Sequence, residues 1–346
     1  MITRFARFLT RLDVQVAILC FHVAFGIFGI YNYFANYTLS THLLVQQSQD
    51  REYVLERSGA NSIEYFIKNI QQQLLILAKN ESVSSIQVSA MEPILKNFVD
   101  NALSPVSGIA RYNQSGKLIA IENRQRIKTG QNEDYSDYEF IQWSKDPENR
   151  SKIFISYPYV ARAGASKGKI ILVIATPCYN SNTYTGTLAV RFTLEEFQKT
   201  FLDPIITKED SVFIVDGKGI VVTGNKALLN KNLFDYAKAQ QWTGWQDFVK
   251  KFTLVIHSDE YKSSWSFKNP GQKTKEFLIA SNRIDVTHAQ RDLFLVVLIP
   301  ADSINRSLDP LHWYGSFWLG ASILFTISAG ILFLSVQKLA RGKIKQ

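Results

Sequence analysis

The sequence contains very little cysteine and histidine, which argues against two kinds of site. Its 346 residues include only Cys20 and Cys178, and these lie in different predicted segments, so no disulfide framework is expected. The five histidines are far apart, and no pair has the spacing of metal ligands: His22, His42, His257, His288 and His312. We therefore predict no metal site and no cofactor.

Motifs of common catalytic and phosphate-binding sites are also missing. The segment Gly164–Gly168 (GASKG) has the letters of a nucleophile elbow, but that turn requires a helix after it, and a strand-like run follows here. The segment GKGIVVTG, from Gly217, lacks the spacing and the Lys-Ser/Thr end of a phosphate-binding loop. Helix capping and helix-dipole roles account for the nearby acids Asp134, Asp137 and Glu139. We predict no catalytic residue and no enzymatic activity.

Positive charge is scarce outside the two ends of the chain. The net charge is +9, of which residues 1–13 carry +2 and residues 337–346 carry +4, leaving +3 for everything between them. This distribution does not indicate nucleic-acid binding. The basic ends instead flank two charge-free runs, Val14–Phe34 with 21 residues and Leu311–Val336 with 26 residues.

Each charge-free run is long enough to cross a bilayer, so both are predicted to be transmembrane helices. The basic flanks place both termini in the cytoplasm by the positive-inside rule. The alternative for the first run is a cleaved signal peptide. Its apolar stretch is longer than that of a signal peptide, and no clear A-x-A cleavage site follows it.

Proline is absent between the first apolar run and Pro93, and a helical pattern continues through this region. Apolar residues recur at spacings of three and four and so form one stripe: Ile63, Phe66, Ile67, Ile70, Leu74 and Leu77. We predict one long helix that reaches about Lys79. The alternative is two helices with a bend near Gly59, because glycine is a weak helix former.

Strand-like runs follow in two groups. The first group comprises a hairpin, a short helix with a capping box of Ser136 and Glu139, three further strands and a helix that begins at Thr193. Its strands are predicted at Val106–Tyr112, Lys117–Asn123, Lys152–Ala161, Lys169–Thr176, which should end at Pro177, and Thr185–Phe192.

The second group repeats this layout in shortened form, without a residue-level repeat. It has a hairpin around the turn DGKG, helical stretches within Asn232–Lys251, and four more strands. The strands are predicted at Ser211–Asp216, Ile220–Thr223, Thr253–His257, Ser264–Lys268, Phe277–Ile284 and Leu293–Pro300. The fold class is therefore α+β with antiparallel sheets.

Four motifs in this order resemble the double Cache (tandem PAS-like) family of extracytoplasmic sensor domains, found in bacterial chemoreceptors, sensor kinases and diguanylate cyclases. They are D-x-S-D-x-E-F-x-x-W (Asp134–Trp143), I-S-Y-P-Y (Ile155–Tyr159), I-A-T-P (Ile174–Pro177) and F-I-V-D-G-K-G (Phe213–Gly219). The resemblance covers about residues 40–309. It implies two PAS-like Cache subdomains along a long N-terminal helix, flanked by the two transmembrane helices.

The resemblance and the apolar runs together predict seven segments. They are a cytoplasmic N-terminus (1–13), a transmembrane helix (14–34), a stalk helix (35–81), a membrane-distal Cache subdomain (82–203), a membrane-proximal one (204–310), a second transmembrane helix (311–336) and a basic cytoplasmic tail (337–346).

The resemblance also implies a small-molecule pocket in the distal subdomain. Amino-acid-binding members carry an Arg on the short helix, whereas that position appears here as Tyr138, and the positions of their acids fall near Tyr159 and Asn180. A mainly aromatic and neutral site is therefore expected, in place of an α-amino-acid site. The candidate ligand-binding residues are Tyr138, Trp143, Tyr157 and Tyr159, with Arg111 and Arg191 as anion contacts. The alternative for each aromatic residue is core or rim packing.

These observations predict a two-pass protein of the bacterial plasma (inner) membrane, with its central domain periplasmic or extracellular. It would sense a small molecule and pass the signal to a cytoplasmic or membrane partner. Because related receptors continue into an output domain and this chain stops ten residues past Val336, the alternative is a receptor that has lost that domain.

A second function class remains open, namely a membrane-anchored scaffold that binds a protein or a cell-envelope component. Small residues in the second apolar run also favour close helix packing, in a homodimer or against a partner: Ser316, Gly320, Ser322, Thr326 and Gly330.

Overall fold

The computed structural model describes residues 12–205, 211–240, 245–258, 260–267, 275–300 and 309–343. The predicted N-terminal segment lies outside these residues except for its last two positions, as do residues 301–308 and the last three residues of the predicted tail. The chain divides into two compact units, one of residues 51–301 and one of residues 1–50 with 302–346. The domain boundaries predicted from the sequence stay predictions.

Helix α2 (Leu12–Lys79) is unbroken, as the absence of proline predicts. Its apolar stripe is buried from Ile63 to Leu74, and Leu77 is half-buried. Gly59 causes no break. A Cβ atom at this position would lie 2.3 Å from Ile205 Cδ1 and 3.4 Å from Leu295 Cδ2. The glycine therefore allows close packing of other segments against the helix.

The first sheet has six antiparallel strands: β1 (Val106–Asn113), β2 (Leu118–Asn123), β3 (Phe154–Ile155), β4 (Tyr159–Val160), β5 (Ile170–Asn180) and β6 (Thr183–Thr193). Their order is β2-β1-β6-β5-β3, and β4 also pairs with β5. Helices α3 (Glu81–Ser84) and α4 (Val88–Asn101) precede the sheet, and α6 (Leu194–Phe197) follows it. Thr193 caps α6, as predicted, by accepting the Glu196 backbone N–H at 3.3 Å.

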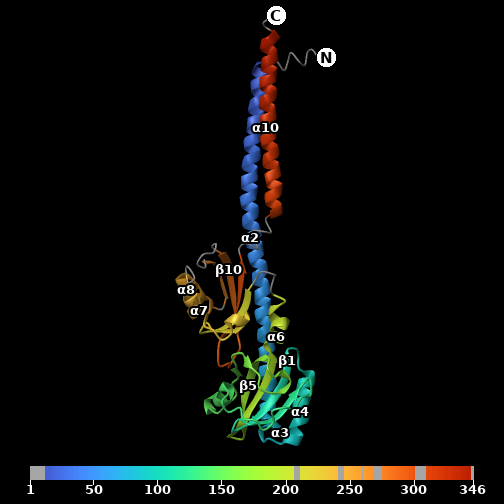
Figure 1. The fold of residues 1–346 in the computed structure, drawn as a ribbon, viewed down its shortest axis with the longest axis vertical. Coiled ribbons are helices and arrows are strands. Elements are labelled where there is room, and N and C mark those ends of the chain that lie inside the picture. Colours follow the sequence, from blue (N-terminus) through green and yellow to red (C-terminus); the bar gives the residue numbers. More distant parts are fainter. Residues whose placement is uncertain are drawn as a thin grey trace. The chain divides into compact units, whose positions relative to one another are not determined.

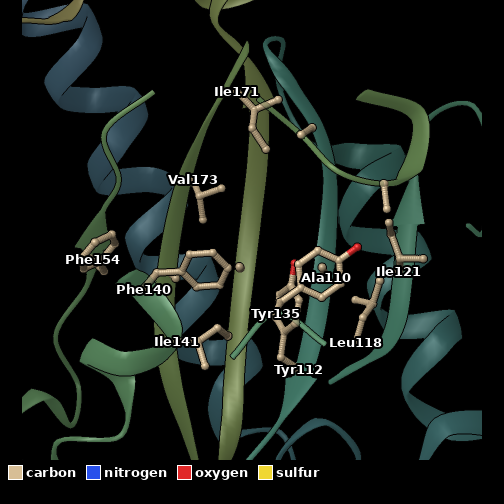
Figure 2. Close-up of a cluster of buried hydrophobic side chains, with 14 residues drawn as sticks. Ala110, Tyr112, Leu118, Ile121, Tyr135, Phe140, Ile141, Phe154, Ile171 and Val173 are labelled. Atoms are coloured by element: carbon tan, nitrogen blue, oxygen red, sulfur yellow. The ribbon is translucent and has the colours of Figure 1, made fainter. Parts of the chain in front are cut away.

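The two faces of this sheet are covered by different elements. One face carries an apolar cluster that includes Ala110, Val173 and Phe140, and helix α5 (Glu139–Ser144) contributes to it (Figure 2). The other face contacts α2, where the Phe66 and Phe192 rings lie 5.8 Å apart. The position of a residue along a strand therefore decides which of two environments its side chain enters.

Two strand predictions are wrong at prolines. Strand β5 continues through Pro177 to Asn180. Its neighbour β3 pairs only with Ile174 and Ala175, so that side of β5 is a sheet edge at Pro177. Proline has no backbone N–H, and at an edge no ladder hydrogen bond is lost. The predicted strand 152–161 is split into β3 and β4, with Pro158 between them.

The predicted capping box is also wrong. Helix α5 begins at Glu139, and its N-cap residue is Tyr138, whose side chain makes no capping hydrogen bond. Ser136 lies in a preceding turn, where its backbone N–H donates to Asp134 Oδ1 at 2.8 Å. The aspartate turn takes the place of the expected serine cap.

The second sheet has five antiparallel strands in the order β8-β7-β11-β10-β9: β7 (Ser211–Asp216), β8 (Val221–Thr223), β9 (Glu260–Phe267), β10 (Lys275–Ile284) and β11 (Leu293–Pro300). Helices α7 (Leu233–Ala239) and α8 (Trp245–Val255) cover one face. The strand predicted at 253–257 is wrong, because Phe248, Phe252 and Val255 are buried at helical spacing and extend α8 to Val255.

The smaller unit contains the first part of α2 together with α10 (Asp309–Lys343) (Figure 1). Small residues of the two helices meet there. A Cβ atom on Gly26 would lie 2.7 Å from Thr326 Oγ1, and one on Gly29 would lie 2.8 Å from Ser322 Oγ. The packing predicted for a dimer or a partner stays a prediction, and the close packing observed at Ser322 and Thr326 is within the chain, whereas an added Cβ atom on Gly320 or Gly330 meets nothing within 4 Å.

A search of the described residues finds no helix that combines the length and the apolarity needed to cross a membrane. The two transmembrane helices therefore stay a prediction from the sequence.

Candidate functional site

A cavity of about 350 Å³ lies beside α5 in the 51–301 unit. Residues 137–140, at the start of the helix, form one wall, and residues between Phe154 and Arg162 form the other. The second wall is the interrupted edge of the sheet, where Pro158 separates β3 from β4. The volume is at the lower end of the range of ~300–1,000 Å³ found for small-molecule sites.

Three of the predicted tyrosines line this cavity: Tyr138, Tyr157 and Tyr159. The Tyr138 and Tyr159 rings lie 5.0 Å apart. Burial raises the pKa of all three phenols, and that of Tyr157 rises to about 12. Each hydroxyl is therefore protonated at neutral pH and can both donate and accept a hydrogen bond.

The Tyr138 hydroxyl is buried and has no hydrogen-bond partner among the described residues. A buried hydroxyl without a partner is unfavourable. The Tyr138 side chain thus lines the cavity, and its hydroxyl is enclosed by protein and unpaired.

A salt bridge that the sequence analysis missed lies at the same place. The Arg162 guanidinium donates two hydrogen bonds to the Asp137 carboxylate, at 3.1 and 2.5 Å. Its central carbon also lies 4.5 Å from the Tyr138 ring centroid. The hydrogen bonds from Arg162 hold the pKa of Asp137 below its usual value. Both side chains line the cavity and supply it with one positive and one negative group.

No local sequence signal indicates this pair. Asp137 precedes a helix, and helix capping was a sufficient explanation for it. Arg162 follows β4, and its contact with Asp137 spans 25 positions of the chain. Only the return of the chain along the sheet edge brings the two residues together.

The other three candidates do not line the cavity. Trp143 packs against Phe154 with ring centroids 5.5 Å apart. Arg111 is fully buried and donates hydrogen bonds to Val83 O at 3.0 Å, to Thr185 Oγ1 at 2.9 Å and to Tyr112 O. These bonds use all three of its nitrogen atoms, so the structure sets Arg111 apart from the cavity.

Arg191 is buried, and it lies two positions after Ala189 on β6. It therefore projects to the same sheet face as the cluster in Figure 2, to which Ala189 belongs. Its Nε atom has no hydrogen-bond partner among the described residues. Its positive charge lowers the pKa of Tyr138 and Tyr159 against the larger, opposing effect of burial. Arg191 thus lies near Tyr138 and Tyr159, on the sheet face that carries the apolar cluster.

The cavity wall also makes contact with the second sheet. The Tyr157 hydroxyl donates to Asp216 Oδ2, at the end of β7, with a distance of 2.6 Å. Arg291 stacks on the Tyr157 ring with its guanidinium carbon 3.7 Å from the ring centroid, and its Nη2 atom lies 3.6 Å from Glu139 Oε1. Tyr157 and Glu139 both line the cavity.

The loop that carries Arg291, residues 285–292 between β10 and β11, is also bonded to α2. Gln71 Nε2 donates to Thr287 O at 2.8 Å, and the Asp285 backbone N–H donates to Glu64 Oε2 at 3.1 Å. The same loop therefore contacts the cavity wall and the long helix.

Comparison of sequences finds no match: no protein-family model and no curated protein matches the chain. Comparison of folds gives a different result. The ligand-binding domain of the Pseudomonas fluorescens chemoreceptor CtaA, in complex with L-isoleucine, matches at TM-score 0.55 and 15% identity, over 78% of this chain and 99% of that domain.

Two further solved structures match the fold. The ligand-binding domain of the Pseudomonas aeruginosa amino acid chemoreceptor PctB matches at TM-score 0.51 and 11% identity, over 75% of this chain and 97% of that one. An extracellular ligand-binding receptor from Desulfohalobium retbaense matches at TM-score 0.52 and 13% identity, over 71% of this chain but only 39% of its own length.

The fold is accordingly that of the extracellular, Cache-type ligand-binding sensor domains. The structural matches confirm the fold resemblance inferred from the four motifs, at sequence identities of 11–15%.

Proposed function

We propose that this protein is a membrane-bound extracytoplasmic sensor whose ligand is a small molecule, and that it transmits ligand binding across the membrane to a partner protein. In this proposal it is a two-pass protein of a bacterial plasma membrane, both termini are cytoplasmic and it has no enzymatic activity. The observation that carries the proposal is the cavity beside α5, which is lined by three tyrosines, one of them with an enclosed and unpaired hydroxyl, and by the Asp137–Arg162 ion pair.

The chemistry of the cavity wall supports a ligand with both an apolar part and a charged or polar group. Tyrosine rings favour flat or apolar surfaces and cations. Arg162 can turn from Asp137 toward an anionic group, and Asp137 is then free to accept from an ammonium. The amino-acid complexes of CtaA and PctB support including amino acids among the compounds tested, although the expected arginine on the short helix is replaced here.

The contacts of Tyr157 support a route for the signal. A ligand that touches Tyr157 or Glu139 changes the surroundings of Asp216 and Arg291, which belong to the second sheet and its loop. The same loop is hydrogen-bonded to α2. Ligand binding would then bias a small displacement of that loop against the helix.

The test is thermal unfolding of the full-length protein in detergent, against carboxylates, amines, amino acids, purines and sugars. A ligand at 100 times its Kd adds about 2.7 kcal/mol to the free energy of unfolding, which raises the midpoint measurably. In Tyr138→Phe, the ligand-induced rise should shrink, while the unliganded protein should be as stable as the wild type or up to ~1 kcal/mol more stable, because an unpaired hydroxyl is removed.

Tyr184→Phe is the matched control. This tyrosine belongs to β6, and its hydroxyl lies 2.9 Å from Thr187 Oγ1, away from the cavity. The variant should lose stability without losing the ligand response. A panel without any midpoint shift would contradict the sensor proposal and leave the scaffold hypothesis as the better one.

A further inference from the structure

Arg191 is a buried arginine whose guanidinium has no partner within the described part of the chain. The residue is 7% exposed, and its Nε atom is enclosed and makes no hydrogen bond. Among the described residues, the guanidinium also forms no ion pair and does not lie over an aromatic ring. A buried positive charge without a partner is strongly unfavourable. The guanidinium is therefore open to an anion that comes from outside the chain.

Other buried charges of the first sheet do have partners. Arg111 donates hydrogen bonds from all three of its nitrogen atoms. The carboxylate of Glu122 lies 3.0 Å from the Lys128 Nζ atom. These two residues have a structural role that explains their charge. Arg191 differs from both, because an apolar side chain would pack at its position without the cost of burying a charge.

The strand register places Arg191 between Gly108 on β1 and Val173 on β5. Its guanidinium lies against the backbone of Gly164. A Cβ atom at Gly164 would lie 3.2 Å from Arg191 Nη2 and 3.5 Å from Nη1, and it would lie 2.9 Å from the Cδ1 atom of Ile121 (Figure 2). The glycine therefore leaves room for the guanidinium at this side of the apolar cluster.

Two tyrosines connect Arg191 with the cavity beside α5. Tyr138 and Tyr159 line the cavity, and their rings lie 5.0 Å apart. Burial raises the pKa of both phenols, and the nearby charge of Arg191 opposes this effect. The Tyr138 hydroxyl is enclosed and unpaired, as is Arg191 Nε. Two unpaired donors favour a ligand group that accepts hydrogen bonds and donates none.

We propose that the ligand of this sensor carries a carboxylate and that Arg191 binds it, with the Tyr138 hydroxyl as a second donor. This inference rests on the proposed function and names the class of its ligand. The two oxygen atoms of a carboxylate match the fork of a guanidinium. The positive charge of Arg191 would repel an amine, and a neutral amide brings donors of its own.

Arg162 is the other arginine beside these tyrosines, but it already has a partner. It donates two hydrogen bonds to the Asp137 carboxylate. An anion that bound to Arg162 would first have to replace that carboxylate, whereas no protein contact is lost when an anion binds to Arg191. The ligand carboxylate is therefore assigned to the sheet face, and the Arg162–Asp137 pair remains for a second polar group of the ligand.

Thermal unfolding of the full-length protein in detergent tests the ligand class. Each carboxylate and amino acid of the panel, with acetate, benzoate and phenylacetate among them, is compared with its own primary amide at constant ionic strength. Inorganic phosphate is measured as a second oxyanion. We expect at least one carboxylate to raise the unfolding midpoint, and its amide to leave the midpoint unchanged.

Variants then test the residue. In Arg191→Met the affinity for that carboxylate should fall at least tenfold, and Arg191→Lys, which keeps the charge without the fork, should fall between this variant and the wild type. The matched control is Arg150→Met. Arg150 is exposed and lies 5.0 Å from the centroid of the Tyr179 ring, and its replacement should leave the affinity unchanged.

Two results would overturn this inference and leave the proposed function standing. The first is a midpoint raised only by amines, purines, sugars or phosphate. The second is a carboxylate response that is lost in Arg162→Met and kept in Arg191→Met. A panel without any midpoint shift would overturn the inference and the proposed function together.

A second measurement needs no ligand. Unliganded Arg191→Met should unfold at the midpoint of the wild type or above it, because a buried charge without a partner is removed. Arg111→Met should unfold at a lower midpoint, because buried hydrogen bonds are lost. An equal fall in both variants would show that Arg191 is paired within the folded protein, and it would overturn the inference.

Discussion

Two arginines of the first sheet have different roles because their side chains point to opposite faces of the sheet. Arg111 and Arg191 looked equivalent as anion contacts in the sequence. Arg111 projects from β1 toward α3, where it hydrogen-bonds the Val83 carbonyl, and Arg191 projects from β6 to the opposite face, near the tyrosines. Neighbouring residues of a strand point to opposite faces, so a single position changes the environment completely.

Replacement of Arg111 should affect stability and not ligand binding. In Arg111→Met, the buried acceptor Val83 O and the half-buried Thr185 Oγ1 lose their donor, and we expect the free energy of unfolding to fall by about 3 kcal/mol. Chemical denaturation measures this loss. Arg124→Met is the control, because Arg124 also donates to two carbonyls but is exposed, and it should cost less than about 1 kcal/mol.

The burial of Tyr157 and its hydrogen bond to Asp216 predict a loss of stability at high pH. Burial and this hydrogen bond raise the pKa of Tyr157 from 10.0 to about 12 in the folded protein. The protonated phenol is therefore favoured in the folded state, so its contribution is complete below pH 10 and is lost as the pH rises through 12.

Thermal unfolding between pH 9 and 12 measures this contribution. In Tyr157→Phe the midpoint should fall less steeply than in the wild type, although other buried tyrosines keep part of the slope. Tyr65→Phe removes an exposed hydroxyl and should leave the slope unchanged. Identical slopes for the wild type and Tyr157→Phe would show that the pKa of Tyr157 is not raised in the folded protein.

Among the elements, α2 and α10 pack where small residues allow it. Gly26 and Gly29 face Thr326 and Ser322, whereas Gly320 has nothing within 4 Å of an added Cβ atom. The glycines in these apolar runs therefore differ in function, although the sequence pattern treats them alike.

Gly29→Leu should separate the two helices, because its side chain has no space beside Ser322, at a cost of about 1–3 kcal/mol. The measurement uses His22→Cys with Phe325→Cys in a Cys20→Ser background, since these two rings are 4.8 Å apart. We expect the cross-link between positions 22 and 325 to be lost in Gly29→Leu and kept in Gly320→Leu. Cross-linking in both would argue against this packing.

For the whole molecule, the distribution of charge predicts the orientation of the protein in the membrane. The basic excess lies at both ends of the sequence, and the residues between the two apolar runs carry little net charge. By the positive-inside rule, we expect both ends to remain in the cytoplasm and the residues between the runs to be exported.

Labelling of intact cells with a membrane-impermeant maleimide tests this orientation. Gln114 is an exposed residue in the β1–β2 turn. In a Cys20→Ser background, Gln114→Cys should be labelled from outside, and Lys345→Cys should be labelled only after the cells are permeabilised. The native Cys178 is buried and should not react in the folded protein. Labelling of Lys345→Cys in intact cells would contradict the proposed topology.

Local patterns in the sequence were enough to predict most of the fold. The β1–β2 hairpin, the long strands β6, β7 and β11, the Thr193 cap and the unbroken α2 follow from side-chain periodicity, turn residues and the positions of proline, all of which act over a few residues. The candidates Tyr138, Tyr157 and Tyr159 came from the family resemblance and not from these local patterns, and the three residues line one cavity.

Only the tertiary structure decided which polar groups meet. The Arg162–Asp137 pair, the Tyr157–Asp216 bond and the opposite faces of Arg111 and Arg191 depend on contacts 25 or more residues apart or on the strand register. Pro177 belongs here too, because only the short reach of β3 makes a proline acceptable in β5. Periodicity specifies which residues are buried, but the choice of partner depends on how distant segments are brought together, and local patterns do not contain that information.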